Sequence, residues 1–400
     1  MTEWKTYRLG DIAKFQTGKL NSNAAVENGK YPFFTCSPNT LAIDNYAFDK
    51  EAILLAGNNA EGNFSIKYYK GKFNAYQRTY IIEADNDICD IKFLFYALKL
   101  CLHQFKLMSQ GTSTKFLTTV ILNNFEISLP SLEEQRRIAG ILGAIDDKIE
   151  NNRRINANLE LQAQALYKQW FVDFEFPNEE GKPYKSSGGK MVDSELGLIP
   201  EGWSVGKLED IGDIIGGGTP SKVVAEYYTK NGIAWITPKD LSVSHLKFTA
   251  KGETDITELG YKNSSAKIMP RGSVLFSSRA PIGYISIAKN DICTNQGFKS
   301  VVPNNGCTAF VYYFLLSNTE NIESKATGST FKEASGALMK SLELVIPSDD
   351  ILEKFKKIMS PIFESQEKFE VENETLATLR DTLLPKLMNG ELSVNNFSVD

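Results

Sequence analysis

Apolar residues alternate at spacings of three and four along two long stretches of the chain, a pattern typical of paired helices. The first stretch has the seam positions Ile138, Leu142, Ile145, Ile149, Asn152, Asn156, Leu159, Ala163, Leu166 and Trp170. The second has Phe355, Met359, Ile362, Gln366, Phe369, Asn373, Leu376, Arg380, Leu383 and Leu387, at a constant offset of 217. We predict two long helices that pair as an antiparallel coiled coil, since the intervening polypeptide is long enough to return.

Three details of these stretches bear on the helices. Ser131 and Glu134 have the spacing of a capping box, which predicts the start of the first helix. Ser360-Pro361 has the pattern of a new N-cap with a first-turn proline, so the second helix is either broken or kinked there or continuous. Asn156 and Asn373 occupy the same repeat position, where they either fix the helix register from a buried site or face water.

A longer unit occurs twice in the chain, and the helices are its C-terminal part. Trp4-x4-Leu9-x-Asp11-Ile12 returns as Trp203-x4-Leu208-x-Asp210-Ile211. Gly111-Thr112-Ser113-x-Lys115 returns as Gly328-Ser329-Thr330-x-Lys332, and 125–130 aligns with 342–347 at the same offset of 217. The repeat predicts two copies of one domain. The alternative is a duplicated domain whose copies share no role.

The short apolar runs 52–56 and 273–276 predict strands, and the segments 91–108 and 308–320 predict helices. The expected fold class is therefore α+β, with two tandem domains of mixed α/β structure, each followed by a long helix, related by pseudo-twofold symmetry. We place the domains at 1–130 and 201–347, the helices at 131–175 and 348–390, a linker rich in Pro, Gly and polar residues at 176–200, and a tail at 391–400.

Charge is distributed unevenly along the chain. The net charge is −5, but segments 1–130 and 181–347 each carry a balance of +2, whereas 131–180 carries −4 and 348–400 carries −5. This permits basic patches on the domains without proving that they bind nucleic acid.

No apolar run approaches the roughly 18 residues of a membrane span, and no signal-peptide pattern opens the chain, so we expect a cytoplasmic protein without a membrane partner. The five scattered cysteines are expected to be reduced.

The residues needed for common catalytic sites are scarce. The chain has two histidines and lacks both the Gly-x4-Gly-Lys-Ser/Thr phosphate loop and the Asn/Asp-Pro-Pro-aromatic motif of adenine methyltransferases. Gly216-Gly217-Gly218-Thr219 is better explained as a turn than as a phosphate cradle. We therefore predict no catalytic residue, no metal site and no cofactor on this chain.

Polar segments with nearby glycines are candidates for contacts with DNA, because Arg, Lys, Asn, Gln and Ser/Thr read base edges in the major groove. The candidates are Asn58, Asn59, Tyr76, Gln77, Arg78, Thr112, Ser113, Lys115, Ser277, Ser278, Arg279, Asn295, Gln296, Lys299, Ser329, Thr330 and Lys332. Each has turn chemistry as its alternative, and Gln77 and Gln296 could instead be buried structural residues. Aligning the copies sets 58–61 against 278–281, with unlike donors and acceptors, so the copies should read different sequences.

Several motifs together resemble one family. They are Leu-Pro-Ser-Leu-Glu-Glu-Gln-Arg-Arg-Ile (129–138), Ala-Leu-Tyr-Lys-Gln-Trp-Phe (165–171), Ile-Pro-Glu-Gly-Trp (199–203) and Leu-Pro-Lys-Leu-Met-Asn-Gly-Glu (384–391). In combination they resemble the specificity subunit of type I restriction–modification systems, over essentially the whole chain. Residues 348–353 depart from the family's Glu-Gln-x-x-Ile pattern, because the glutamine is missing.

The resemblance implies two target-recognition domains, each reading one half of a gapped, asymmetric site in double-stranded DNA. It also implies that the helices dock two methyltransferase subunits, which bring S-adenosylmethionine. Restriction subunits, with ATP and magnesium, would complete the cleaving complex. Two other classes remain as alternatives, a self-contained DNA-modifying enzyme and a coiled-coil scaffold that does not bind DNA.

Overall fold

The computed structural model describes residues 4–328 and 332–393. The chain forms two compact units, one made of residues 1–150 and 374–400 and the other of residues 151–373. Both divisions fall inside long helices, so each unit contains a part of both helices.

Unit 1 contains a six-stranded sheet with the order β2-β8-β5-β7-β3-β4, in which only β3 and β7 pair in parallel. We call the segment from β1 to β10 the first sheet domain. Its elements are β1 Lys5–Arg8, α1 Leu9–Ile12, β2 Ala13–Thr17, a 3-10 turn Ser22–Ala24, β3 Tyr31–Phe34, β4 Leu41–Ile43, β5 Phe48–Ala56, β6 Asn58–Asn59, β7 Ile66–Ala75, β8 Thr79–Ala84, α2 Ile91–Leu100, α3 Leu102–Met108, β9 Lys115–Phe116, α4 Thr119–Asn124 and β10 Glu126–Leu129.

Unit 2 contains a five-stranded sheet with the order β14-β22-β19-β20-β17. We call the segment from β13 to β23 the second sheet domain; the hairpin β11 Met191–Ser194 and β12 Gly197–Pro200 precedes it. Its elements are β13 Ser204–Lys207, α6 Leu208–Ile211, β14 Gly212–Gly216, β15 Tyr228–Thr229, β16 Trp235–Ile236, α7 Pro238–Ser244, β17 Phe248–Thr249, β18 Asp255–Ile256, α8 Glu258–Lys262, β19 Val274–Ser278, β20 Ile282–Ala288, β21 Cys293–Thr294, β22 Lys299–Pro303, α9 Thr308–Ser317, α10 Thr319–Lys325, α11 Gly336–Lys340 and β23 Glu343–Ile346, with 3-10 turns at Ala225–Tyr227 and Asn304–Gly306.

The two sheet domains repeat the same frame. In each domain the first strand pairs antiparallel with the last, and the registers correspond: Lys5 faces Leu129 in the first, and Ser204 faces Ile346 in the second. The order β2-β8-β5-β7 in the first sheet matches β14-β22-β19-β20 in the second. The predicted duplication and the α+β fold class are therefore confirmed.

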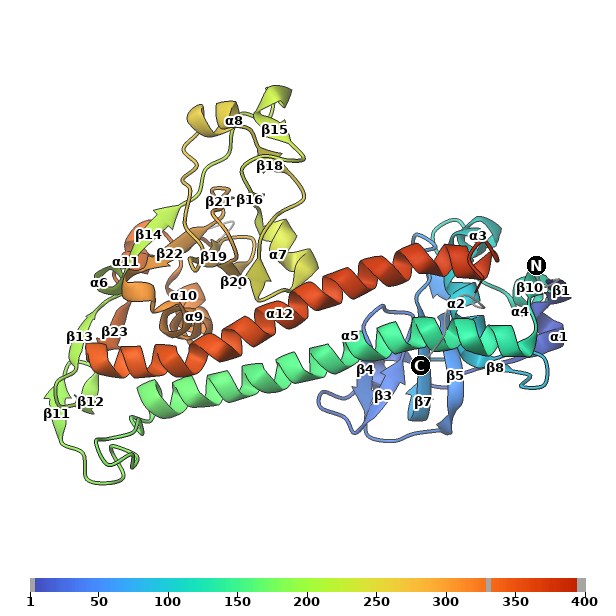
Figure 1. Cartoon of the computed structure of the whole chain (residues 1–400), viewed down its shortest axis with the longest axis horizontal. Helices are drawn as coiled ribbons and strands as arrows, with labels where there is room; N and C mark the ends of the chain where they lie inside the picture. The colour runs from blue at the N-terminus through green and yellow to red at the C-terminus, as the bar shows by residue number, and fades with distance from the viewer. Residues whose placement is uncertain (1–3, 329–331, 394–400) are drawn as a thin grey trace. The chain divides into compact units, whose positions relative to one another are not determined.

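Two long helices follow the sheet domains, α5 Leu132–Tyr167 and α12 Asp349–Met388. They pack side by side and antiparallel (Figure 1). In unit 1, Asp146 of α5 forms an ion pair with Arg380 of α12 at 2.7 Å, and in unit 2 the ring centroids of Trp170 and Phe355 lie 5.7 Å apart. Residue numbers thus rise along one helix as they fall along the other, which confirms the predicted antiparallel pair. A π-helical turn, Lys168–Val172, ends the first helix.

The details predicted for the helix ends have clear outcomes in the structure. The amide of Glu134 donates to Ser131 Oγ at 3.3 Å, so serine caps α5 as the sequence indicates. Pro361 lies within α12, which continues through it without a break. Proline removes one helical hydrogen bond, but the turns on either side are held because Phe355 and Met359 before it and Gln366 after it are almost fully buried.

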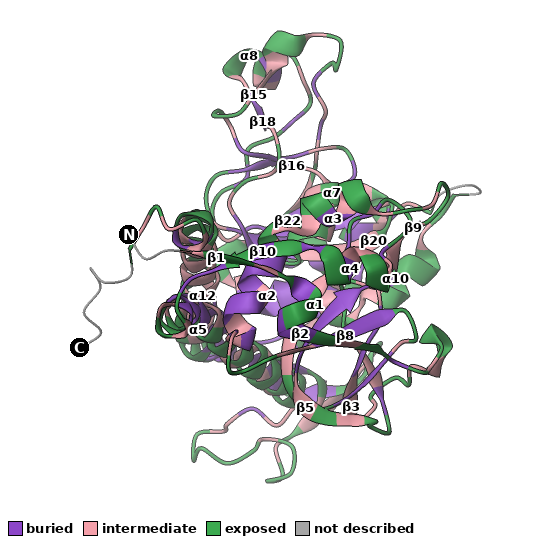
Figure 2. Cartoon of the chain, turned by 90° about the vertical axis from the view of Figure 1, so that its right-hand side faces the viewer, coloured by how far each residue is buried: buried purple, intermediate pink, exposed green. Residues whose placement is uncertain are grey.

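Each sheet domain buries apolar side chains against both helices of its own unit. In unit 1 the core includes Leu142 of α5 and Leu387 of α12. Most residues of α2 and β8 are also buried (Figure 2). In unit 2 the core includes Trp170 and Phe355, and Phe171 packs edge-to-face against Phe355 with 4.7 Å between the ring centroids. Each large side chain buried in this way contributes roughly 1.5–3 kcal/mol. Within the described residues, no helix is long and apolar enough to cross a membrane.

Candidate nucleic-acid interface

Three candidate segments of the first sheet domain meet at the ends of its strands. The amide of Gly57 donates to the carbonyl of Arg78 at 2.8 Å, and the carbonyl of Gly57 accepts from the amide of Leu117 at 2.8 Å. The strand β6, Asn58–Asn59, then pairs antiparallel with β9, Lys115–Phe116. We call the segments 57–62, 76–78 and 110–117 together the first loop edge.

Side chains on the first loop edge differ in their exposure to solvent. Gln77, Arg78, Thr112 and Ser113 are exposed, whereas Asn58, Asn59, Tyr76 and Lys115 are half-buried. Gln77 is therefore not the buried structural residue that the sequence left open; its amide donates to Asn21 Oδ1 at 2.7 Å.

The two half-buried asparagines play different roles. Asn59 Oδ1 accepts from the amides of Glu61 and Asn63 at 2.9 and 3.0 Å, so this side chain shapes the turn. The Oδ1 atom of Asn58 is buried without a protein partner. A buried amide oxygen without a partner is costly, so Asn58 would gain a hydrogen bond if its side chain turned outward to meet a donor on DNA.

The second sheet domain repeats this junction with different side chains. The amide of Ser278 donates to the carbonyl of Gly297 at 2.7 Å, and its carbonyl accepts from the amide of Ala334 at 2.9 Å. Ser278 is thus the counterpart of Gly57, so Arg279 is the counterpart of Asn58. This shifts the sequence alignment of the two copies by one residue. We call the segments 277–281, 295–299 and 327–335 the second loop edge, of which residues 329–331 are not described.

Ser277 and Ser278 do not lie on the surface of the second loop edge. Both are fully buried, and Ser277 Oγ donates to the carbonyl of Pro281 and accepts from the amide of Tyr284, each at 2.8 Å. Neither hydroxyl is available to a base edge in this conformation. Ser329 and Thr330, the matching candidates from the last segment, lie outside the described residues.

Arg279 and Lys299 share one carboxylate. Arg279 Nη1 lies 3.3 Å from Glu333 Oε2, and Lys299 Nζ lies 3.1 Å from Glu333 Oε1. Glu333 is itself held, because its amide and carbonyl pair with Thr327. Glu333 was not predicted from the sequence, since nothing in the local sequence marks it as the partner of an arginine 54 residues away. Lys332 beside it is exposed.

A cavity of about 720 Å³ lies beside Arg279, Asn295 and Gln296. Lining residues that the sequence analysis missed include Thr219, Lys222, Tyr228, Trp235, Lys239 and Glu253. Gln296 is exposed rather than buried and hydrogen-bonds Thr219. The cavity combines cationic, amide and carboxylate groups, which are the groups that contact phosphates and base edges.

In the sequence, the glycine run 216–218 is the feature that points to this cavity. A Cβ atom on Gly217 would lie 1.9 Å from the carbonyl oxygen of Asn295, so only glycine permits the close approach of these two segments. Gly216 ends β14, and the structure assigns no turn to residues 217–219, so the run serves this close approach and not the predicted turn. Gly18 makes the same approach to Ala75 in the first domain, also at 1.9 Å.

The described residues contain no group of three or more His, Cys, Asp or Glu side chains that could hold a metal ion. Burial raises the pKa of Cys89 and of Cys293 to about 12, so both thiols stay protonated near neutral pH. Each loop edge carries hydrogen-bonding and charged side chains at the end of its own sheet.

The comparisons with known proteins agree with this arrangement. The type I restriction modification DNA specificity domain family matches residues 1–161 and 200–379. The chain is 27% identical to the HindI specificity subunit of Haemophilus influenzae, over 98% of this chain and all of that protein, and 29% identical to the EcoDI specificity subunit of Escherichia coli, over 98% of this chain and 89% of that one. A 190-residue part is 39% identical to the MjaIX specificity subunit of Methanocaldococcus jannaschii, covering 47% of this chain and 44% of that protein.

A solved structure has the same fold. The type I restriction–modification S subunit from M. genitalium superposes with a TM-score of 0.63 at 17% identity, covering 96% of both chains. The chain therefore belongs to the specificity (S) subunits of type I restriction–modification systems, a non-catalytic family that recognises DNA target sites.

Proposed function

We propose that each sheet domain reads one half of a gapped, asymmetric site in double-stranded DNA, through its own loop edge. The two recognition domains would be residues 1–130 and 201–347, and the helical regions 131–175 and 348–390. The linker 176–200 would connect the first helical region to the second domain, and 391–400 would be the tail. The chain itself would supply recognition, while methyltransferase subunits bring S-adenosylmethionine and restriction subunits use ATP and magnesium.

One observation carries this proposal. The two loop edges share a backbone junction, yet Asn58 stands in the first where Arg279 stands in the second. Asparagine can pair bidentately with adenine, and arginine with guanine. A common frame with different reading groups supports two domains that bind DNA in the same manner and select different sequences.

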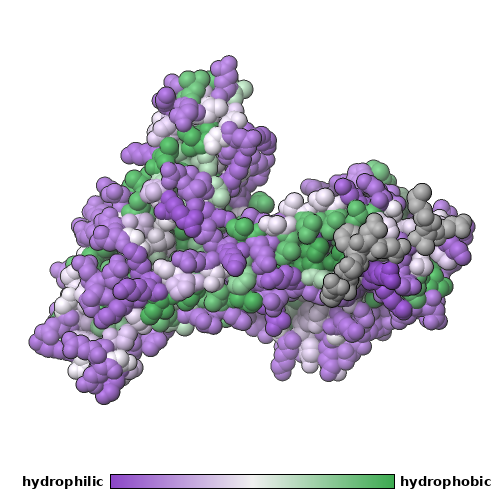
Figure 3. Space-filling view, viewed as in Figure 1, coloured by the Kyte–Doolittle hydropathy of each residue, from purple (hydrophilic) through white to green (hydrophobic). Residues whose placement is uncertain are grey.

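The helix pair is the proposed docking site for two methyltransferase subunits and the element that sets the gap. Its surface supports docking, because Leu161, Ile358, Val371 and Leu379 are exposed although they are apolar. Hydrophobic residues also occur at several places along the helix pair in Figure 3, among hydrophilic ones. A subunit docked over these side chains would remove their apolar surface from water.

An exchange of one domain tests the proposal. Residues 1–130 are replaced by the corresponding domain of a relative, the chain is assembled with its methyltransferase subunits, and methylated sites are mapped. We expect one half of the site to change and the other half and the gap to remain. A change in both halves would contradict independent reading, and methylation by the purified chain alone would favour a self-contained enzyme. A chain that binds its partners but not DNA would favour a scaffold.

A further inference from the structure

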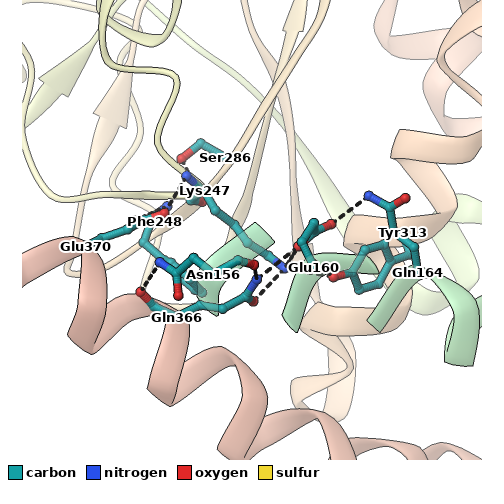
Figure 4. Close-up of polar contacts among 9 residues, drawn as sticks. All are labelled: Asn156, Glu160, Gln164, Lys247, Phe248, Ser286, Tyr313, Gln366 and Glu370. Atoms are coloured by element: carbon teal, nitrogen blue, oxygen red, sulfur yellow. Dashed lines mark hydrogen bonds and ion pairs between the residues drawn. The ribbon is translucent and has the colours of Figure 1, made fainter. Parts of the chain in front are cut away.

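Lys247 lies where the second sheet domain meets the two long helices. Its side chain is only 9% exposed, and its ammonium group donates to Glu160 Oε2 at 2.6 Å and to Gln366 Oε1 at 3.0 Å. Glu160 belongs to α5 and Gln366 to α12, so one cation of the sheet domain binds both helices (Figure 4). A third hydrogen bond, of 2.7 Å, reaches Tyr313 Oη, which in turn donates to Glu160 at 3.1 Å.

The backbone at this position is held as firmly as the side chain. The amides of Lys247 and Phe248 donate to the two carboxylate oxygens of Glu370 on α12, at 3.0 and 3.2 Å. The carbonyl of Lys247 accepts from the amide of Ile287 at 2.8 Å and from Ser286 Oγ at 3.0 Å, both on β20. Lys247 thus joins the helix pair to the sheet within a single residue.

Two elements next to Lys247, α7 in the chain and β20 through hydrogen bonds, lead to the cavity and to Arg279. The helix α7, Pro238–Ser244, ends three residues before Lys247, and its first turn lines the cavity that Arg279 borders. The strand β20, Ile282–Ala288, begins three residues after Arg279. A shift of Lys247 relative to the helices would therefore move α7, which lines that cavity, and β20, which begins just after Arg279.

The contact is polar and is not closely packed. A cavity of about 420 Å³ adjoins it, lined by residues that include Glu160, His245, Lys247, Gln366 and Glu370. Buried charged pairs of this kind contribute little net stability, because desolvation offsets their attraction, but they can select one orientation among several. Here the orientation selected is that of the sheet domain on the helices.

Charge is retained at this contact near neutral pH. Burial lowers the pKa of Lys247 to about 8, against the opposing effect of Glu160. Burial alone would raise the pKa of Glu160, but the ion pair with Lys247 and hydrogen bonds from Lys247, Gln164 and Gln366 hold it below its ordinary value. The ring of Phe363 lies 4.0 Å from the ammonium and further favours its charged form.

In unit 1, different residues make the corresponding polar contact between the sheet domain and the helices. Tyr96, at the offset of 217 from Tyr313, donates to Asp146 of α5 at 2.7 Å. The cation on that carboxylate is Arg380 of α12, also at 2.7 Å, and not a residue of the first sheet domain. In the described part of the chain, a domain-borne cation that contacts both helices is therefore particular to unit 2.

We propose that Lys247 is a positioning residue that fixes the orientation of the second recognition domain on the helix pair and thereby determines which gap length between half-sites is accepted. This inference rests on the proposed function, in which the two domains read half-sites separated by a gap. The helices would provide the length of the spacing, and Lys247 would restrict how far the second loop edge can deviate from it.

The test uses the full chain assembled with its methyltransferase subunits. The variant carries Lys247→Met with Glu160→Gln, so that no unpaired charge is left buried. The control carries Lys182→Met with Glu180→Gln, which removes an exposed ion pair of the linker. Methylation is measured on DNA duplexes that keep both half-sites and differ by single base pairs in the gap.

We expect the variant to keep both half-site sequences while its preference for the parental gap over its neighbours falls about tenfold, within the roughly hundredfold that a misplacement of about 1 Å can cost. The control should keep the wild-type preference. Tyr313→Phe, which removes one hydroxyl and no charge, should broaden the gap profile in the same direction, and it decides the question if the double variant does not fold.

An unchanged profile, or an equal loss of methylation at all gaps, overturns the proposal. A wild-type complex that shows no gap preference would overturn both this inference and the proposed function; a fixed gap in wild type and variant overturns this inference alone.

Discussion

Asn152 of α5 donates its side-chain amide to Asn373 Oδ1 of α12 over 3.0 Å, and Asn152 is fully buried. The same amide also donates to Glu372 Oε2 at 2.9 Å. Asn156, one turn further along α5, donates to the backbone carbonyl of Gln366 at 3.1 Å. The polar seam positions therefore face the partner helix rather than water, which decides between the two alternatives that the sequence left open.

Asn373→Ala should lower the free energy of unfolding by about 1–3 kcal/mol, because it leaves the buried amide of Asn152 with one acceptor fewer. Urea denaturation of the full chain measures the difference. Asn158→Ala is the matched control on the exposed face of α5, and its effect should stay within about 0.5 kcal/mol. Equal effects of the two substitutions would show that the pair does not stabilise the helices.

Arg279→Ala should weaken binding to the cognate site by about 1–3 kcal/mol and relax selection at one base position, if its guanidinium reads a guanine edge. Glu333 holds that guanidinium in place in the free protein. Binding of the assembled complex to duplexes substituted at each position of the second half-site provides the measurement. Unchanged affinity and unchanged methylation specificity would remove Arg279 from the reading residues.

Lys115→Ala should act differently, because we expect its ammonium to contact phosphate. Binding to all sequences should weaken by a similar factor, and the slope of log affinity against log salt should decrease in magnitude by about one. Titrations with cognate and unrelated DNA at several salt concentrations test this. If only cognate binding weakens, Lys115 contacts a base instead.

Lengthening the helix pair should lengthen the accepted gap. Four residues are inserted into each helix, after Glu150 in α5 and after Asn373 in α12, which are the divisions between the two units, so the contacts within each unit are kept. Four residues add about 6 Å of helix and about 40° of rotation. Since DNA rises about 3.4 Å per base pair, the gap should grow by one or two base pairs with both half-sites unchanged. Methylation mapping in cells reveals the gap, and an active variant with the parental gap would show that the helices do not set it.

Glu370 should make stability depend on pH. Burial raises its pKa to about 7, although the amides of Lys247 and Phe248 oppose the shift. Between its ordinary value and about 7, the folded chain keeps a proton that the unfolded chain releases. The free energy of unfolding therefore falls as pH rises through this interval, by roughly 1–3 kcal/mol, and the contribution is constant above it. Urea denaturation of wild type and Glu370→Gln at about pH 5 and about pH 7.5 should show this loss in the wild type only. Parallel pH profiles would contradict the assignment.

The sequence by itself determined the duplication, the two long helices and their antiparallel pairing. A heptad pattern specifies which face of a helix is buried over its entire length, and a repeat at a constant offset specifies a repeated frame. The motifs at 129–138 and 165–171 also carried the family resemblance, since they are contiguous stretches of residues. These features depend on residues close together in the chain, or on a comparison of the chain with itself.

Only the tertiary structure decided which side chains meet. It placed the hydroxyls of Ser277 and Ser278 inside the second domain, paired Arg279 with Glu333, and set Lys247 between α5 and α12. It also carried α12 through Pro361, because buried neighbours on both sides outweigh one missing hydrogen bond. Arg279 and Glu333 are 54 residues apart, and Lys247 and Glu160 are 87 apart. The burial of the two serines likewise depends on how the surrounding elements pack. No local pattern encodes that packing.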